Sequence, residues 1–398
     1  MLCVTSLRSM STRRLLALIA GVVAAAGGGT AIAVAGGDGP TPPAKPLDAV
    51  IHDAATAPAV DGITAKIQFT NHLIDASSLQ GSDPILSGAS GRLWLGSGHK
   101  LRLELQSDSG DAQIVSDGKT VTVYDATMNT AYRADLPQDP TATDPNPDQP
   151  PTLASIQADL KKLAQHWNIS GATPTAIAGQ PAYSVRISPS HDGGLLGAAE
   201  LAADANTGVP LRAAIYAAGD SSPVLELQAT HISYGKVDSS VFDVAPPAGA
   251  KVTDFTPKTT TGSPGTEPKP VTGAAAVGAA VPFTLTAPDK LVGLPRHEVR
   301  LIDAGDHPAA LVTYGAGLGG IAVVEQAADP KTDQLGPAAK PKEGESGLSL
   351  PTVSINGATG QELDTALGTM VRFTRAGVTY TVIGSVPAAA AEAAARGL

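Results

Sequence analysis

The residues of this chain that could do chemistry are scattered rather than grouped. Its eight histidines stand singly: His52, His72, His99, His166, His191, His231, His297 and His307. None has the His-x-x-x-His or cysteine-rich spacing of a metal site. The run from Ser190 to Asp192 has the residue types of a hydrolase triad. Triad members meet in space rather than along the sequence, however, and two glycines follow the run, which indicates an exposed turn.

A second motif, Gly315-Ala-Gly-Leu-Gly-Gly320, matches the G-x-G-x-x-G pattern of dinucleotide sites. Such a site needs a helix directly after the glycines, because the helix N-terminus binds the pyrophosphate. Here the residues that follow, Ile321 to Glu325, have strand character. The motif therefore predicts a glycine-rich turn. With no catalytic constellation in view, we predict a protein that is not an enzyme and has no metal or cofactor.

Composition and charge narrow the possible partners. The 398 residues suffice for two domains, and the 43 glycines and 32 prolines favour many short strands joined by turns. Lys and Arg number 27 against 37 Asp and Glu, which gives a formal net charge of −10. Nucleic-acid binding needs basic surface that replaces counterions. We therefore predict no nucleic-acid partner.

The N-terminus, residues 1–35, predicts export. Arg13 and Arg14 precede an apolar run from Leu15 to Ala26, and Ala33-Val-Ala35 is a signal-peptidase pattern. The alternative is an uncleaved membrane anchor, because residues 15–35 have about the 20 residues that a bilayer needs. In either case the body is extracytoplasmic, secreted or tethered to the cell membrane by residues 15–35. Its only cysteine, Cys3, precedes the apolar run, so the exported part has no disulfide and no thiol nucleophile.

The first half of the body alternates as antiparallel strands do. After a Pro/Gly linker at residues 36–46, a short helix is predicted from Leu47 to Ala55 and a strand from Gly62 to Ile74. A hairpin then spans Gly91 to Gln106. Its aliphatic residues fall on one face, with polar residues opposite: Leu93, Leu95, Leu101, Leu103 and Leu105.

The next segment, Ile114 to Pro137, extends the same aliphatic face. Asp117-Gly118 is a hairpin signal between β-branched runs, and Val121 and Val123 share one face of the strand that follows. Together these strands form a broad apolar surface that something must cover.

The predicted cover is a helix from Thr152 to Trp167. Its apolar residues form one stripe: Leu153, Ile156, Leu160, Leu163 and Trp167. Two interpretations of the sheet face remain open. It is either ordinary core beneath this helix or the wall of a cavity for an acyl chain, and alternation alone does not separate them because both bury the same face.

Further strands and a second domain complete the chain. The pattern predicts strands at Ala182–Ile187, Leu201–Asp204, Leu211–Tyr216 and Val224–Tyr234. A low-complexity stretch from Lys251 to Gly273 marks a boundary, and we assign residues 253–280 to the linker. The second domain, residues 281–398, is predicted as strands at His297–Ile302, Ala309–Tyr314, Ile321–Glu325, Met370–Thr374 and Val378–Ile383, with a terminal helix at Ala388–Arg396.

Four segments, in order, resemble one family. They are Leu101 to Leu105, Val115 to Thr130, the AADANTGVPL run from Ala202 to Leu211, and Ile232 to Val252, which ends in Phe242 and a Pro-Pro-x-Gly closure. This order resembles the LolA-type lipoprotein carriers and the RseB/MucB-type sigma-factor regulators. The resemblance covers residues 47–252. Gly293-Leu-Pro295 and the Arg375–Gly384 run resemble, more loosely, the small C-terminal domain of the regulators.

The resemblance implies a fold, a site and partners. The fold would be α+β: an unclosed antiparallel β half-barrel with helices in its concave face, followed by a smaller α+β domain. The concave face would bind a lipid or lipoprotein acyl chain, with a membrane-bound regulatory protein such as an anti-sigma factor as the alternative partner. The expected cavity wall is Leu93, Leu95, Leu101, Leu103, Leu105, Val121, Val123, Leu160 and Trp167.

Overall fold

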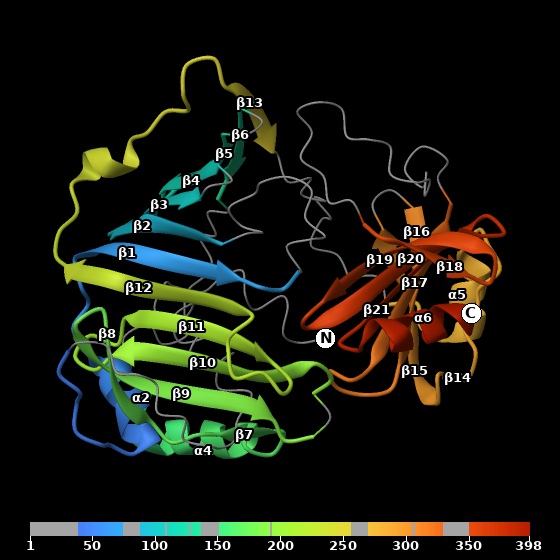
Figure 1. Cartoon of the computed structure of the whole chain (residues 1–398), viewed down its shortest axis with the longest axis horizontal. Coiled ribbons are helices and arrows are strands. Elements are labelled where there is room, and N and C mark those ends of the chain that lie inside the picture. Colours follow the sequence, from blue (N-terminus) through green and yellow to red (C-terminus); the bar gives the residue numbers. More distant parts are fainter. Residues whose placement is uncertain are drawn as a thin grey trace.

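The structure, a computed structural model, describes residues 39–74, 88–107, 110–126, 129–136, 151–191, 193–255, 270–304, 307–328 and 350–398. The expected signal peptide or anchor at residues 1–35 lies outside these ranges, as do Asp192 and residues 256–269 of the predicted linker. None of the helices in the described ranges has the length and apolar character to span a bilayer. The described chain is mostly β and forms two sheets, each with its own helices (Figure 1).

The larger sheet is an unclosed half-barrel that curls around one side of the molecule (Figure 1). Its strands are β1 (Gly62–Asn71), β2 (Ala89–Gly96), β3 (Lys100–Ser107), β4 (Gly110–Asp117), β5 (Thr120–Asp125), β6 (Thr130–Asp135), β7 (Trp167–Ile169), β8 (Thr173–Ile177), β9 (Gln180–Pro189), β10 (Leu196–Asp204), β11 (Pro210–Ala217), β12 (Leu225–Tyr234) and β13 (Lys251–Phe255). They lie in the order β13-β6-β5-β4-β3-β2-β1-β12-β11-β10-β9-β7, with β8 beside β9. Two antiparallel meanders thus meet where β1 pairs with β12, and only β13 runs parallel to its neighbour, β6. The predicted half-barrel and the α+β class are confirmed.

The strands form where the sequence alternates. On β1, the buried Ile63, Ala65 and Ile67 take turns with exposed Thr64 and Lys66. Alternation of this kind buries one face of an antiparallel sheet and leaves the other in water. We call the face that carries Ile63 and Ala65 the inner face and the opposite one the outer face.

The predicted turn at Asp117-Gly118 is confirmed. Asp117 Oδ1 accepts hydrogen bonds from the backbone amides of Lys119 and Thr120, both at 2.7 Å. Gly118 has a φ of 91°, a conformation that glycine adopts at no steric cost. These contacts fix the register of β4 and β5, which places Ile114 opposite Val123.

Two helices accompany the larger sheet, α2 (Leu47–Thr56) and α4 (Leu153–Leu163). They contact one another and lie beside β9 and β7 at one end of the sheet (Figure 1). Thr152 caps α4 as predicted, because its hydroxyl accepts the amide of Ser155 at 3.2 Å. The predicted extent of α4 was wrong at its end: the helix ends at Leu163, and Trp167 begins β7, which pairs with β9. The pairing of β7 with a distant strand overrode the helical spacing of Trp167.

A strap, residues 235–250, crosses the outer face from β12 to β13. Its short 3₁₀ helix η3 (Ser239–Phe242) packs on β3 and β4, and Phe242 is buried there. The strap brings β13 to the edge of the sheet beside β6. Strand β13 continues to Phe255, so the first residues of the predicted linker belong to the half-barrel.

The second sheet belongs to the C-terminal domain. Its strands are β14 (Lys290–Leu291), β15 (Leu294–Ala304), β16 (His307–Tyr314), β17 (Ile321–Ala327), β18 (Thr352–Ile355), β19 (Ala358–Thr365), β20 (Gly368–Arg375) and β21 (Val378–Gly384). They lie in the order β14-β15-β16-β17-β21-β20-β19-β18. Two helices, α5 (Ala274–Ala280) and α6 (Ala388–Arg396), complete the domain. The terminal helix has the predicted bounds, whereas α5 lies within the predicted linker and its Val277 is fully buried in the domain's core.

The two domains contact one another through backbone hydrogen bonds. The amide of Leu195, in the turn between β9 and β10, donates to Ser385 Oγ at 3.0 Å. The amide of Ala366, in the turn between β19 and β20, donates to the carbonyl of Leu73, just beyond β1, at 2.8 Å. The C-terminal domain therefore touches the half-barrel at two separate turns.

Candidate functional site

The inner face brings together all seven of the strand residues that the sequence predicted as cavity wall. Leu95 lies directly opposite Leu101, and Leu93 directly opposite Leu103. The register continues through Leu103 to Ile114 on β4 and from Ile114 to Val123 on β5. Directly opposed residues of an antiparallel pair share a face. These side chains therefore form one continuous aliphatic surface.

This surface is incompletely covered. Leu105 is buried at 7% exposed, but Val123 is 36% exposed, and the other predicted strand residues are half-buried: Leu93, Leu95, Leu101, Leu103 and Val121. The core of the C-terminal domain is different, since Val371, Phe373 and Val382 are fully buried there. The same aliphatic residue types are thus close-packed in one domain and partly open in the other.

Sequence reasoning missed part of the inner face. Phe69 on β1 lies opposite Leu227 on β12, and Leu227 is 45% exposed. The alternation of apolar and polar residues is visible in the sequences of both β1 and β12. Nothing in the sequence shows that β1 pairs with β12, which lies more than 150 residues later. This pairing extends the exposed apolar surface across the centre of the sheet.

The two remaining predicted residues lie elsewhere. Leu160 is half-buried on α4 and Trp167 is half-buried on β7. The core cluster that includes Leu93, Leu95, Leu103 and Leu105 contains neither of them. In the strand order, β7 and the β2–β5 meander occupy different ends of the sheet.

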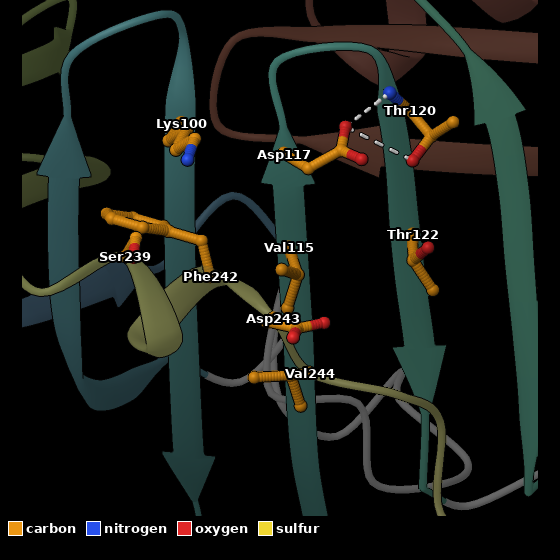
Figure 2. A pocket seen from close by; sticks show the side chains of 9 residues that line it. All are labelled: Lys100, Val115, Asp117, Thr120, Thr122, Ser239, Phe242, Asp243 and Val244. Atoms are coloured by element: carbon orange, nitrogen blue, oxygen red, sulfur yellow. Dashed lines mark hydrogen bonds between the residues drawn. The ribbon is translucent and has the colours of Figure 1, made fainter.

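A separate hollow of about 250 Å³ lies on the outer face, between β3–β5 and the strap (Figure 2). Its lining is largely polar: Lys100, Val115, Asp117, Thr120, Thr122, Ser239, Phe242, Asp243 and Val244. Hydrogen bonds from the backbone amides of Thr120 and Lys119 lower the pKa of Asp117. The Asp117 carboxylate is thus part of the turn, and this hollow lacks the apolar lining that an acyl chain needs.

A larger hollow, of about 610 Å³, opens at the ends of β1, β2 and β3. Phe69 and Ala89 contribute inner-face side chains to it, beside polar residues such as Gln68 and Ser90. The predicted leucines and valines do not line it. The aliphatic residues therefore form an open face rather than the wall of either hollow.

The charged groups that are most buried in the half-barrel are already paired. Arg212 donates to both Glu200 and Glu226, and to the Tyr216 hydroxyl at 2.9 Å. Burial lowers the pKa of Arg212, but the bond to Tyr216 and the charge of Glu200 outweigh it and leave the pKa raised. The Arg186 guanidinium stacks on the Tyr216 ring at 4.0 Å. These contacts satisfy the charges of a structural network.

The two sequence motifs considered as possible dinucleotide-binding and catalytic sites form a turn and a surface contact in the structure. Gly315 to Gly320 is a turn that leads into strand β17, as predicted. Ser190 Oγ lies 2.7 Å from His191 Nδ1, and both residues are at the surface. Among the described residues, no group of three or more His, Cys, Asp or Glu side chains could hold a metal ion.

One buried carboxyl stands apart in the C-terminal domain. Glu325 on β17 is fully buried, and burial raises its pKa to about 7. Its Oε2 accepts the amide of Thr286 at 2.8 Å, while Oε1 has no hydrogen-bond partner among the described residues. The Tyr314 hydroxyl also lacks one. The sequence signal was present, because Glu325 occupies a buried position in the alternation Ile321, Val323, Glu325.

Comparisons with known proteins give one family match, over a short part of the chain. A family described as "Predicted periplasmic protein (DUF2092)" matches residues 64–143, about a fifth of the chain. No curated protein matches.

Among solved structures, MucB in complex with the periplasmic part of MucA is 15% identical, with 88% of this chain and 95% of that chain covered and a TM-score of 0.41. The Pseudomonas aeruginosa MucA/MucB complex is 17% identical, with 88% and 96% covered and a TM-score of 0.42. A LolA superfamily protein from Nitrosomonas europaea is 11% identical, with 50% and 98% covered and a TM-score of 0.21. At these scores the likeness says nothing by itself about function.

Proposed function

We propose that this chain is an exported, non-enzymatic binding protein whose inner sheet face accepts the acyl chain of a lipid or lipoprotein. The observation that carries the proposal is the incomplete burial of that face. Leu227 is 45% exposed and Val123 36% exposed, on strands that lie on either side of the half-buried Leu93 and Leu103. Exposed apolar patches of this kind, with a polar surround, mark binding surfaces in soluble proteins.

The chemistry of the face fits an acyl chain. The side chains that line it are largely aliphatic, with Phe69 and Ser116 as the exceptions, and the polar neighbours of the leucines on β2 and β3 point to the opposite face. Each methylene transferred from water to such a surface contributes about 0.8 kcal/mol. A long acyl chain therefore gains enough to bind without specific polar contacts. The sequence resemblance to LolA-type carriers supports the same ligand class.

The location follows from the N-terminal segment. Residues 1–35 have the sequence of a signal peptide or an anchor, so the binding face would work outside the cytoplasm. The family that matches residues 64–143 is described as periplasmic, which is consistent with this location.

A matched pair of variants tests the proposal. Leu227 on the inner face and Ile383 on the C-terminal sheet are both strand residues and both 45% exposed. We expect Leu227→Glu to weaken binding of a fluorescent fatty acid at least tenfold, because the carboxylate would be desolvated by the bound chain. Ile383→Glu should leave the affinity unchanged. Equal affinities for the two variants, or no lipid in extracts of the purified chain, would contradict acyl binding.

A second candidate function is regulation through a membrane-bound partner such as an anti-sigma factor, which the resemblance to RseB/MucB-type regulators implies. The observation that favours it is the C-terminal domain, which is hydrogen-bonded to the half-barrel through Ser385 and Ala366. The test is co-purification of a candidate anti-sigma factor with the full chain. Retention of that partner after deletion of residues 281–398 would count against a role for the C-terminal domain.

A further inference from the structure

Three nitrogen-bearing side chains lie side by side on the outer face, at the centre of the half-barrel. Lys66 on β1 is directly opposite His231 on β12 and directly opposite Arg92 on β2. All three are exposed. Adjacent strands are about 4.8 Å apart, so the row His231–Lys66–Arg92 spans about 10 Å.

An irregularity in the sheet builds this row. The register of β1 with β12 shifts between Lys66 and Ile67, and Thr230 is the extra residue on β12. Thr230 and His231 are consecutive yet both exposed, between buried Ala229 and Ile232. Thr230 Oγ1 donates to the carbonyl of Lys66 at 3.3 Å. Bulges in sheets re-aim side chains and are enriched beside functional sites.

The charges of the row are only partly balanced within the fold. Like charges directly opposite on neighbouring strands destabilise a sheet, and Lys66 faces Arg92. Neither forms an ion pair with another described residue. Glu104, which lies opposite Arg92 on β3, is bound by Arg102 and Gln113. The cross-strand neighbours of Lys66 are His231 and Arg92, so no carboxylate lies directly opposite it.

We propose that Lys66, Arg92 and His231 bind a phosphate group, supplied by a lipid headgroup or by free phosphate. The guanidinium of Arg92 matches two phosphate oxygens, and Lys66 adds a point charge. The His231 ring adds an N–H donor. The site faces away from the acyl-binding face and does not depend on it.

The spacing favours phosphate over an acidic peptide. The donors stand on adjacent strands at about 4.8 Å intervals, and the long side chains of Lys66 and Arg92 are able to reach one compact anion. Carboxylates on one side of an extended peptide repeat only every second residue, about 7 Å apart, and match this row poorly. The experiment must therefore distinguish binding of phosphate from binding of an acidic peptide.

The deciding variant is Arg92→Glu, because its two effects on the sheet oppose one another while its effect on phosphate binding does not. It removes a phosphate ligand and places a carboxylate opposite Lys66, where an opposite-charge pair stabilises the sheet, and opposite Glu104, where a like-charge pair destabilises it. Lys290→Glu is the control, since Lys290 is exposed on β14 in the other domain and the charge change is the same. Lys66→Gln is a second variant that removes charge without reversing it.

The probes are inorganic phosphate, by calorimetry, and vesicles of phosphatidylglycerol or phosphatidylcholine, by co-sedimentation, each with the full chain. We expect Arg92→Glu and Lys66→Gln to weaken binding at least tenfold and Lys290→Glu to leave it unchanged. Circular dichroism should show that all three variants are folded. A response to phosphate identifies the free anion as ligand, and a response only to phosphatidylglycerol identifies the headgroup.

Binding that is insensitive to Arg92→Glu overturns the proposal. So does binding of a polyglutamate peptide without binding of phosphate.

Discussion

The amide of Leu195 and the side chain of Ser385 join the two domains at one of their two points of contact. Leu195 donates to Ser385 Oγ at 3.0 Å and to the Ser385 carbonyl at 3.1 Å, and the same hydroxyl donates to the Leu367 carbonyl at 2.7 Å. Gly194, next to Leu195, makes this approach possible. A Cβ on Gly194 would lie 2.2 Å from the Ser385 carbonyl oxygen.

The first prediction concerns this junction. We expect Gly194→Ala to separate the two domains at the β9–β10 turn, because the added methyl group would overlap the Ser385 backbone. Small-angle scattering should show a larger radius of gyration, and the circular dichroism spectrum should stay unchanged. Gly219→Ala is the control: Gly219 also has a positive φ, 88°, but nothing lies within 4 Å of its Cβ position. Equal radii for the two variants would mean that the junction does not hold the domains together.

The strands of the half-barrel were predictable wherever alternation was strong. The hairpin from β2 to β3 and the turn at Asp117 follow from residue types alone, because each alternating run has one apolar face and each turn has its own chemistry. The helix from Thr152 was predicted too long because Trp167 continues the helical spacing. Its pairing with Pro189 on β9 is a long-range contact that local spacing does not encode.

The inner face was predicted only in part, for the same reason. The leucines of β2 and β3 are neighbours in sequence, so their shared face could be inferred. The pairing of Phe69 with Leu227 joins segments far apart in the chain, and the outward shift of Thr230 arises from that same pairing. Leu160 was assigned to the cavity wall from its apolar stripe alone. A stripe shows that a helix packs, but not against which strands.

The second prediction tests the buried charges of the half-barrel. Arg212→Met should cost about 3 to 5 kcal/mol of unfolding free energy, because it leaves the buried carboxylate of Glu200 without its strongest partner. The side chains of Arg212 and Glu200 are only 10% and 7% exposed. Denaturant unfolding gives the value. Arg133→Met is the control, because its pair with Asp254 is exposed and worth less than about 1 kcal/mol. A similar loss for both variants would contradict the assignment.

The third prediction is a pH dependence in the C-terminal domain. Burial raises the pKa of Glu325 from 4.5 to about 7, so the folded domain binds a proton that the unfolded chain releases between these pH values. Stability should therefore fall as the pH rises from 4.5 to 7, by up to about 3 kcal/mol, and level off above.

The variant Glu325→Gln isolates this effect. The amide keeps an oxygen that can accept the Thr286 amide, but it does not ionise. Unfolding followed at several pH values should lose the slope between pH 4.5 and 7 that the wild-type chain shows. If the slope persists in Glu325→Gln, another group in the domain causes it.

The fourth prediction concerns the strap over the outer face. Phe242 is 4% exposed and its ring covers Gly96 so closely that a Cβ there would lie 2.8 Å from the ring. Removing the ring should release η3 and, with it, the segment that brings β13 to β6. We expect Phe242→Ala to cost about 3 kcal/mol, as for other buried aromatic residues. Hydrogen exchange of the β13 amides should accelerate more than that of β3.

Val252→Ala, on β13 itself but 48% exposed, is the control and should change stability by less than about 0.5 kcal/mol. Unchanged exchange at β13 in Phe242→Ala would show that the pairing of β13 with β6 holds this strand without the strap.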